Sequence, residues 1–246
     1  MAGGLAALVA VLAKLKAVIF VVLKLTFVAT AGTAFVSVGA YSLLFGWPFA
    51  AGFVVLLFVH EMGHVVQLRR QGIKASAPMF VPFLGAVISA RSLGTNALAE
   101  ARVGLAGPVL GTVGAGIVAL AAVVADAHLL YALAYTGFLL NLFNLIPVTP
   151  LDGGRAMAAM APAMWIVGLV ILVAVAVLFG NPLIFIFIVI GFLDVRRRLR
   201  ARREGGSEQD AYYKVAPQQR LYVGVVYLSL LVRLAAGMQA TLVATS

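Results

Sequence analysis

Long apolar runs, separated by short polar or basic segments, set the pattern of this sequence. A membrane-spanning helix needs about 20 apolar residues. We therefore predict an all-α polytopic membrane protein with about six transmembrane helices. A further apolar run at about 221–243 carries Arg233 and is either a seventh span or an interfacial helix. The six predicted spans are about residues 17–45, 47–68, 101–124, 129–147, 164–179 and 182–193.

The segment Ser76–Arg91 departs from this pattern. It is apolar but too short to span a membrane, and Pro78 and Pro82 interrupt any helix. The β-branched residues on either side of Gly85 favour two strands, with the glycine at the turn. A strand edge that faced lipid would leave backbone groups unpaired, at a cost of several kcal/mol each. We therefore expect a short membrane-associated β-hairpin inside a protein-lined cavity, or with its edge paired to another strand.

Composition supports a membrane protein and limits its metal chemistry. Of the 246 residues, 63% are hydrophobic and 11% are charged, and the mean hydropathy is +1.10. Soluble domains are nearer half apolar and a quarter charged, so lipid must form part of the solvent around this chain. The chain has no cysteine, which excludes disulfides and thiolate metal sites. A metal would therefore be held by His, Asp or Glu.

Basic residues lie in short clusters that orient the predicted helices. The net charge is +10, and its clustering between apolar runs follows the positive-inside rule rather than the pattern of a nucleic-acid-binding surface. Counting the predicted spans puts three basic clusters on the same side of the membrane. These are Lys14 with Lys16, Arg69–Lys74 and Arg196–Arg203. We expect a multi-pass protein in the cell membrane of a prokaryote, with these clusters on the cytoplasmic side and with no nucleic-acid partner.

The sharpest chemical signal is the motif His60-Glu61-Met62-Gly63-His64. On a helix, positions i and i+4 lie about 6 Å apart on one face, where two imidazoles can bind one zinc ion. Glu61 points to the neighbouring side, where it can take a proton from a water whose pKa zinc lowers to about 7. Ionisable groups inside a span cost roughly 2.5–3.5 kcal/mol each and mark function. The structural alternative is a pair of hydrogen-bonded core histidines with Glu61 in a polar contact.

A catalytic zinc site needs three protein ligands and one open position. Glu61 is better used as the base, and most other acidic residues lie at the ends of spans or in the polar tail. Asp126 and His128 are interpreted as polar groups of a loop. Asp152 remains, in a stretch where Pro147, Pro150 and two glycines break the helix and can aim the carboxylate back into the bundle. The alternative for Asp152 is a helix cap.

At these residues the chain resembles the site-2 protease family of intramembrane zinc metalloproteases, in a compact form without PDZ or CBS domains. The resemblance rests on the HExxH motif in an early span and on the Asn…Pro…Pro-Leu-Asp-Gly-Gly motif at residues 144–154. It covers about residues 50–160 well, and the rest mainly by the pattern of spans. The two motifs together are specific, whereas either alone would be weaker.

The resemblance implies roles for five residues. Zinc is expected on His60, His64 and Asp152, and Glu61 is expected to act as the general base. Asn144 matches a family asparagine that assists the scissile peptide and is the expected substrate-binding residue.

Two further elements match the family. Ala106-Gly107-Pro108 resembles the Gly-Pro element of the third span, although the family usually has an asparagine three residues after that proline, where this chain has Gly111. The family's membrane-associated hairpin matches Ser76–Arg91, and its edge is expected to receive unwound substrate by strand addition.

These features predict an intramembrane zinc metalloprotease that hydrolyses peptide bonds in transmembrane segments of membrane proteins, as in regulated intramembrane proteolysis. The expected partners are a transmembrane substrate, the lipid bilayer and a regulatory membrane protein, with the active site toward the cytoplasmic side. One alternative is a membrane zincin of another family, with its third ligand elsewhere. Another is a divalent-metal transporter that uses the cluster as a transit site. The intact motif argues against an inactive scaffold.

We interpret residues 1–246 as a single membrane-embedded metalloprotease domain. Its catalytic core is about 47–160, followed by a basic cytoplasmic segment at 196–219 and a C-terminal helix at 221–243. The basic segment contains Tyr212 and Tyr213 and could be a docking site for a partner. A solvated loop is the favoured interpretation.

Overall fold

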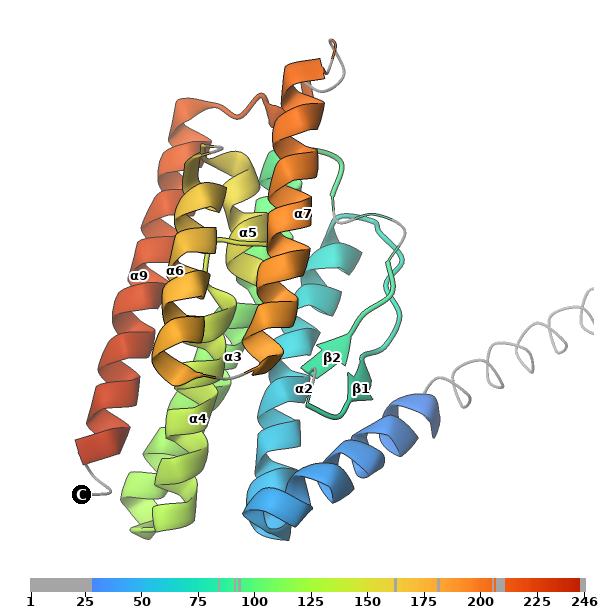
Figure 1. Cartoon of the computed structure of the whole chain (residues 1–246). Helices are drawn as coiled ribbons and strands as arrows, with labels where there is room; N and C mark the ends of the chain where they lie inside the picture. Colours follow the sequence, from blue (N-terminus) through green and yellow to red (C-terminus); the bar gives the residue numbers. More distant parts are fainter. Residues whose placement is uncertain are drawn as a thin grey trace, which may run out of the picture.

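The computed structural model shows a bundle of helices with a small β-hairpin at its side (Figure 1). It describes residues 28–243 except 84, 91, 93, 162, 181, 205 and 207–210. The beginning of the first predicted span, residues 17–27, and Lys14 and Lys16 lie outside the described residues. The long helices are Val28–Phe45, α2 (Trp47–Arg70), α3 (Ala97–Ala125), α4 (His128–Asn144), α6 (Ala163–Phe179), α7 (Pro182–Glu204) and α9 (Pro217–Val243).

The structure confirms the helical membrane fold but not the number of six spans. In the described part of the chain, four helices are long and apolar enough to cross a membrane, namely Val28–Phe45, α2, α3 and α9. The helices α4 and α6 are shorter, with 17 residues each. The C-terminal run, left open between a span and an interfacial helix, forms one of the four candidate spans.

The helix α7 differs from the prediction because it does not stop at the apolar boundary. It continues to Glu204, so the basic segment predicted to begin at 196 starts inside a helix. Arginine is a good helix former, and Arg200 Nε donates to Glu204 Oε1 at 2.8 Å, the i,i+4 spacing that supports a helix.

The hairpin consists of β1 (Met79–Val81) and β2 (Gly85–Val87), which pair antiparallel with Val81 opposite Gly85. This confirms the predicted hairpin, although Gly85 begins β2 instead of forming the turn. Pro82 and Phe83 lie in the turn, and Phe83 takes a positive φ of 64°.

Helix Val28–Phe45 anchors the hairpin beside α2 (Figure 1). The backbone N–H of Phe80 donates to Thr33 Oγ1 at 3.2 Å, and that of Phe83 donates to the Tyr41 hydroxyl at 3.1 Å. The Tyr41 and Phe83 rings also meet edge to face. The hairpin is therefore held by protein on the side of this helix, as expected for a short sheet in a membrane protein.

Glycines let α2 and α3 approach closely near the middle of the bundle. A Cβ added at Gly63 of α2 would lie 2.1 Å from the carbonyl oxygen of Ala106 on α3. One added at Gly107 of α3 would lie 2.2 Å from His64 Nε2. Both distances are far below van der Waals contact, so only glycine fits and the two helices meet through their backbones.

A buried polar cluster ties several helices together at the end of the bundle where α7 becomes basic. Arg198 donates to Glu100 Oε1 at 2.8 Å and to Asp194 Oδ2 at 2.7 Å. Burial alone would lower the pKa of Arg198, but these two carboxylates outweigh it and raise that pKa above its ordinary value. The side chain of Thr149, in the connection after α4, donates to Asp194 at 2.5 Å. Trp165 stacks against the guanidinium, 5.1 Å from ring centre to Cζ.

The same cluster contains a residue that the sequence assigned to a solvated loop. The Tyr212 hydroxyl donates to Glu100 Oε2 at 2.6 Å. Burial and the neighbouring Glu100 carboxylate raise the pKa of Tyr212 well above its ordinary value, so the hydroxyl stays a proton donor. The interpretation of this part of the tail as a free loop was wrong for Tyr212, which joins the basic segment to the start of α3.

Candidate metal centre

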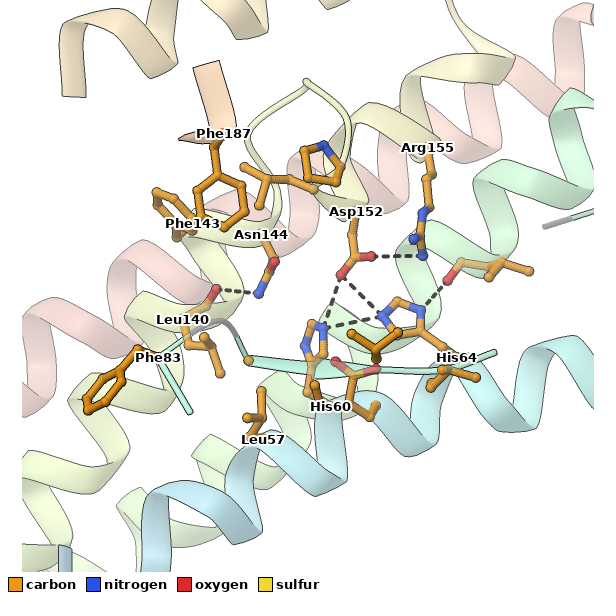
Figure 2. A pocket seen from close by; sticks show the side chains of 18 of the residues that line it. Leu57, His60, His64, Phe83, Leu140, Phe143, Asn144, Asp152, Arg155 and Phe187 are labelled. Carbon is orange, nitrogen blue, oxygen red and sulfur yellow. Dashed lines mark hydrogen bonds and ion pairs between the residues drawn. The ribbon is translucent and has the colours of Figure 1, made fainter. Parts of the chain in front are cut away.

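Three ionisable side chains meet at one point inside the bundle (Figure 2). His60 and His64 come from successive turns of α2, and Asp152 is the first residue of the short helix α5 (Asp152–Ala156). Asp152 Oδ2 lies 3.0 Å from His60 Nε2 and 3.2 Å from His64 Nε2, and the two Nε2 atoms are 3.3 Å apart. All three residues are buried, with 5% exposure at most.

The chain between α4 and α5 explains how Asp152 reaches the histidines. The helix α4 ends at Asn144, and Leu151 precedes α5 as its cap without a side-chain hydrogen bond. Asp152 is therefore not the cap, and its carboxylate is directed at α2. Its neighbour Gly153 packs so closely on the end of α4 that an added Cβ would lie 2.1 Å from the carbonyl oxygen of Leu145. The tight loop is possible only because glycine follows the aspartate.

The outer ring nitrogen of each histidine has a defined partner. His64 Nδ1 lies 2.8 Å from the carbonyl oxygen of Val103, which can only accept, so this nitrogen carries the proton. His60 Nδ1 lies 2.8 Å from Asn141 Oδ1. The amide of Asn141 is oriented by its Nδ2, which donates to the Gly137 carbonyl at 2.7 Å, so its oxygen faces His60. Both rings thus present an Nε2 lone pair to Asp152.

This donor set fits a metal ion. Two lone pairs and a carboxylate oxygen repel one another at these distances unless a cation lies between them, and one proton cannot serve all three contacts. Zn–N bonds of about 2.0–2.1 Å at tetrahedral angles place ligand atoms about 3.3 Å apart. The observed separations of 3.0, 3.2 and 3.3 Å agree with that value. Among the described residues, His60, His64 and Asp152 are a group that could hold a metal ion.

The three residues lie in the wall of a cavity of about 560 Å³ that also exposes Glu61 and Asn144. Glu61 sits between the histidines on α2 and is 9% exposed. Asn144, at the end of α4, donates from Nδ2 to the Leu140 carbonyl at 3.0 Å (Figure 2). The remaining wall is largely apolar, with residues from helix Val28–Phe45, α2, β2, α4 and α7. The cavity thus combines the predicted polar residues with a surface suited to an apolar chain.

Two residues of the site were missed by sequence reasoning. Asn141 supports His60, and Arg155 reaches back with Nη1 3.6 Å from Asp152 Oδ1 (Figure 2). The sequence could have indicated both residues. A polar amide inside an apolar span needs a hydrogen-bond partner, and a cation three residues after Asp152 needs an anion nearby. Asp126 caps the C-terminal end of α3, as expected for a loop residue, whereas His128 is the first residue of α4 instead of a loop residue. Neither belongs to the group of three.

Comparison with known proteins agrees with this geometry. Residues 48–127, which include nearly all of α2, the hairpin and α3, match the model of peptidase family M50, the site-2 protease family. The resemblance read from the sequence is confirmed. The matched region contains the HExxH motif and ends before Asn144 and Asp152.

Two curated relatives carry the name "Putative zinc metalloprotease Rip3", from Mycobacterium tuberculosis strains Erdman and H37Rv. Each is 33% identical over 134 residues, which is 50% of this chain and 34% of the relative. The chain thus matches about a third of the length of these relatives.

Proposed function

We propose that the protein is a zinc metalloprotease that hydrolyses peptide bonds in transmembrane segments of membrane proteins. The observation that carries the proposal is the convergence of His60, His64 and Asp152 in a bundle with four candidate spans. The match to peptidase family M50 and the name of the relatives support the same chemistry.

Zinc held by these three residues would supply a Lewis acid that polarises the peptide carbonyl and lowers the pKa of a water molecule to about 7. The Glu61 carboxylate takes the proton from the attacking water as its oxygen bonds to the carbonyl carbon. The same carboxyl group then gives the proton to the amide nitrogen as the C–N bond breaks. The position of Glu61 in the cavity wall, between the two histidines in sequence, supports this double role as base and acid.

Substrate binding is assigned to Asn144 and β2. Asn144 lies in the cavity wall beside the centre, where its amide can orient the scissile peptide or donate to the developing oxyanion. A helix hides its carbonyls in its own hydrogen bonds, so a substrate must unwind first. The strand β2 pairs with β1 on one side and contributes Gly85, Ala86 and Val87 to the cavity, which supports binding of an extended segment by strand addition.

The setting of the reaction follows from the same features. The four candidate spans support an integral membrane protein. We assign it to the cell membrane, with the basic end of α7 and the polar cluster around Arg198 toward the cytoplasm. The transmembrane substrate, the bilayer and a regulatory membrane protein are its proposed partners.

Zinc content and cleavage, measured together in detergent, test the proposal. We expect about one zinc per wild-type chain and cleavage of a single-span substrate, with both lost in Asp152→Ala and in His64→Ala. If Asp152→Ala kept its full zinc content and its activity, Asp152 would not be the third ligand. The protein would then be a zincin with another set of ligands. Uptake of metal into vesicles without cleavage would support a transporter instead.

A further inference from the structure

Asn141 is an amide in the interior of an apolar helix. It is 2% exposed. Within the described part of the chain, its oxygen faces His60 Nδ1 and its nitrogen donates to the Gly137 carbonyl. Burying an amide without hydrogen-bond partners destabilises a protein. The Gly137 carbonyl belongs to the same helix and needs no amide, so the contact that explains Asn141 is the one with His60.

The helix α3 leaves space for this amide. A Cβ added at Gly111 would lie 2.1 Å from Asn141 Oδ1 and 2.7 Å from its Cγ. The space between α3 and α4 next to His60 therefore has room for one side chain. Asn141 of α4 fills this space, and α3 has glycine there. Gly111 is the position at which an asparagine would be expected from the family pattern.

We propose that Asn141 is the positioning residue that fixes the tautomer and ring direction of His60 for metal binding. We also propose that positions 111 and 141 form a pair in which one carries the amide and the other is glycine. The proposal rests on the proposed function, since it takes His60 as a metal ligand. Asn141 contacts neither metal nor substrate and acts through the imidazole.

The two histidines differ in how their orientation is secured. The partner of His64 is a backbone carbonyl, that of Val103, which no substitution removes. The partner of His60 is a side chain, so it can be tested. Loss of such an outer partner typically weakens metal binding by about 10–100-fold.

The first test measures zinc affinity by competition with a chromophoric chelator, using the full chain in detergent. Asn141→Leu keeps the volume but removes the acceptor, and we expect roughly 10–100-fold weaker binding. Asn141→Asp keeps an acceptor for His60 Nδ1–H but turns its second oxygen toward the Gly137 carbonyl that Nδ2 bonds in the wild type, so we expect an affinity between those of Asn141→Leu and wild type. Thr136→Val is the control, because Thr136 lies on the same helix and its hydroxyl donates to the Ala132 carbonyl of that helix, and it should bind zinc as wild type does.

A second readout separates ligand orientation from general packing. Cobalt(II) in place of zinc has visible absorption bands that depend on ligand geometry. Asn141→Leu should change these bands, whereas Asn141→Asp and Thr136→Val should leave them near those of wild type. Equal loss of affinity in the Asp and Leu variants would overturn the acceptor role.

An exchange of the pair tests the inference without deleting the amide. Gly111→Asn alone should lose zinc, because its Cβ cannot coexist with Asn141. Gly111→Asn combined with Asn141→Gly should recover much of the affinity, with the amide now on α3. No recovery in a folded double variant would contradict the pairing.

The outcomes also distinguish this inference from the proposed function. Absence of zinc from the wild type would overturn both. Wild-type zinc binding together with unchanged affinity in Asn141→Leu would overturn the inference alone and leave the protease assignment intact.

Discussion

Gly107 of α3 faces His64 of α2 so closely that a single methyl group at that position would lie 2.2 Å from His64 Nε2. The same methyl group would be 2.9 Å from His60 Nε2. The backbone of α3 thus forms one wall of the metal centre. The two imidazoles can take up this arrangement only because residue 107 is a glycine.

Gly107→Ala should therefore weaken zinc binding. Overpacking costs about 1–3 kcal/mol, which corresponds to roughly 5- to 150-fold in affinity. Gly116→Ala is the matched control, since it lies on the same helix and a Cβ there meets nothing within 4 Å. Chelator competition on both variants checks the prediction, and similar zinc affinity in the two would contradict it.

Glu61→Gln should separate zinc binding from turnover. The amide cannot take a proton from water, so we expect cleavage to fall by about 10²–10⁴-fold. Glu61 is not one of the three metal-binding residues, and zinc content should stay near that of wild type. The measurement is zinc per chain and cleavage rate on one preparation. Cleavage at the wild-type rate would end the assignment of Glu61 as the base.

Arg198→Gln should destabilise the fold. The guanidinium is 14% exposed and pairs with Glu100, which is 3% exposed, so its loss leaves a buried carboxylate without a cation. Removing one member of a buried pair costs about 3–5 kcal/mol. Arg197→Gln is the control, because Arg197 is 81% exposed and such pairs contribute about 0–1 kcal/mol. Thermal unfolding in detergent measures both, and equal midpoints would refute the prediction.

Acid should weaken the fold through Asp194, which lies just past the apolar part of α7. Burial alone would raise its pKa, but the hydrogen bond from Thr149 and the charge of Arg198 outweigh burial and hold that pKa below its usual value. A lowered pKa in the folded state gives stability that is present above about pH 4 and is lost as the pH falls through the folded-state value.

The comparison for this prediction is Asp194→Asn. The variant should be less stable than wild type near neutral pH, and the difference should shrink below about pH 4 as the wild-type carboxylate takes up a proton. Unfolding midpoints across that range in detergent provide the test. A difference that stayed constant with pH would show that Asp194 does not carry this effect.

The features predicted correctly from the sequence are those that short stretches determine. The spacing of His60 and His64 places both rings on one face of any helix. The prolines and glycine near Ser76–Arg91 exclude a helix, and a hairpin results. The break around Pro147 and Pro150 allowed Asp152 to be directed at the bundle, and the structure places it there.

The features that were missed depend on residues far apart in the chain. Asn141 and His60 are separated by 81 positions, and Arg198 and Glu100 by 98. No local pattern shows which faces of the helices pack against each other, so Glu100 was counted only among the acidic residues at the ends of spans. A buried carboxylate at that place needs a cation, but the sequence offers many arginines and does not indicate which one.

The order of the elements along the chain also controls when the centre can first exist. Both histidines and Glu61 belong to α2, whereas Asp152 follows the hairpin, α3 and α4. During synthesis the ribosome therefore delivers the base and two ligands well before the third. A nascent chain that has inserted only its first helices holds two of the three candidate ligands, and the third joins them only once the loop after α4 has packed against α2.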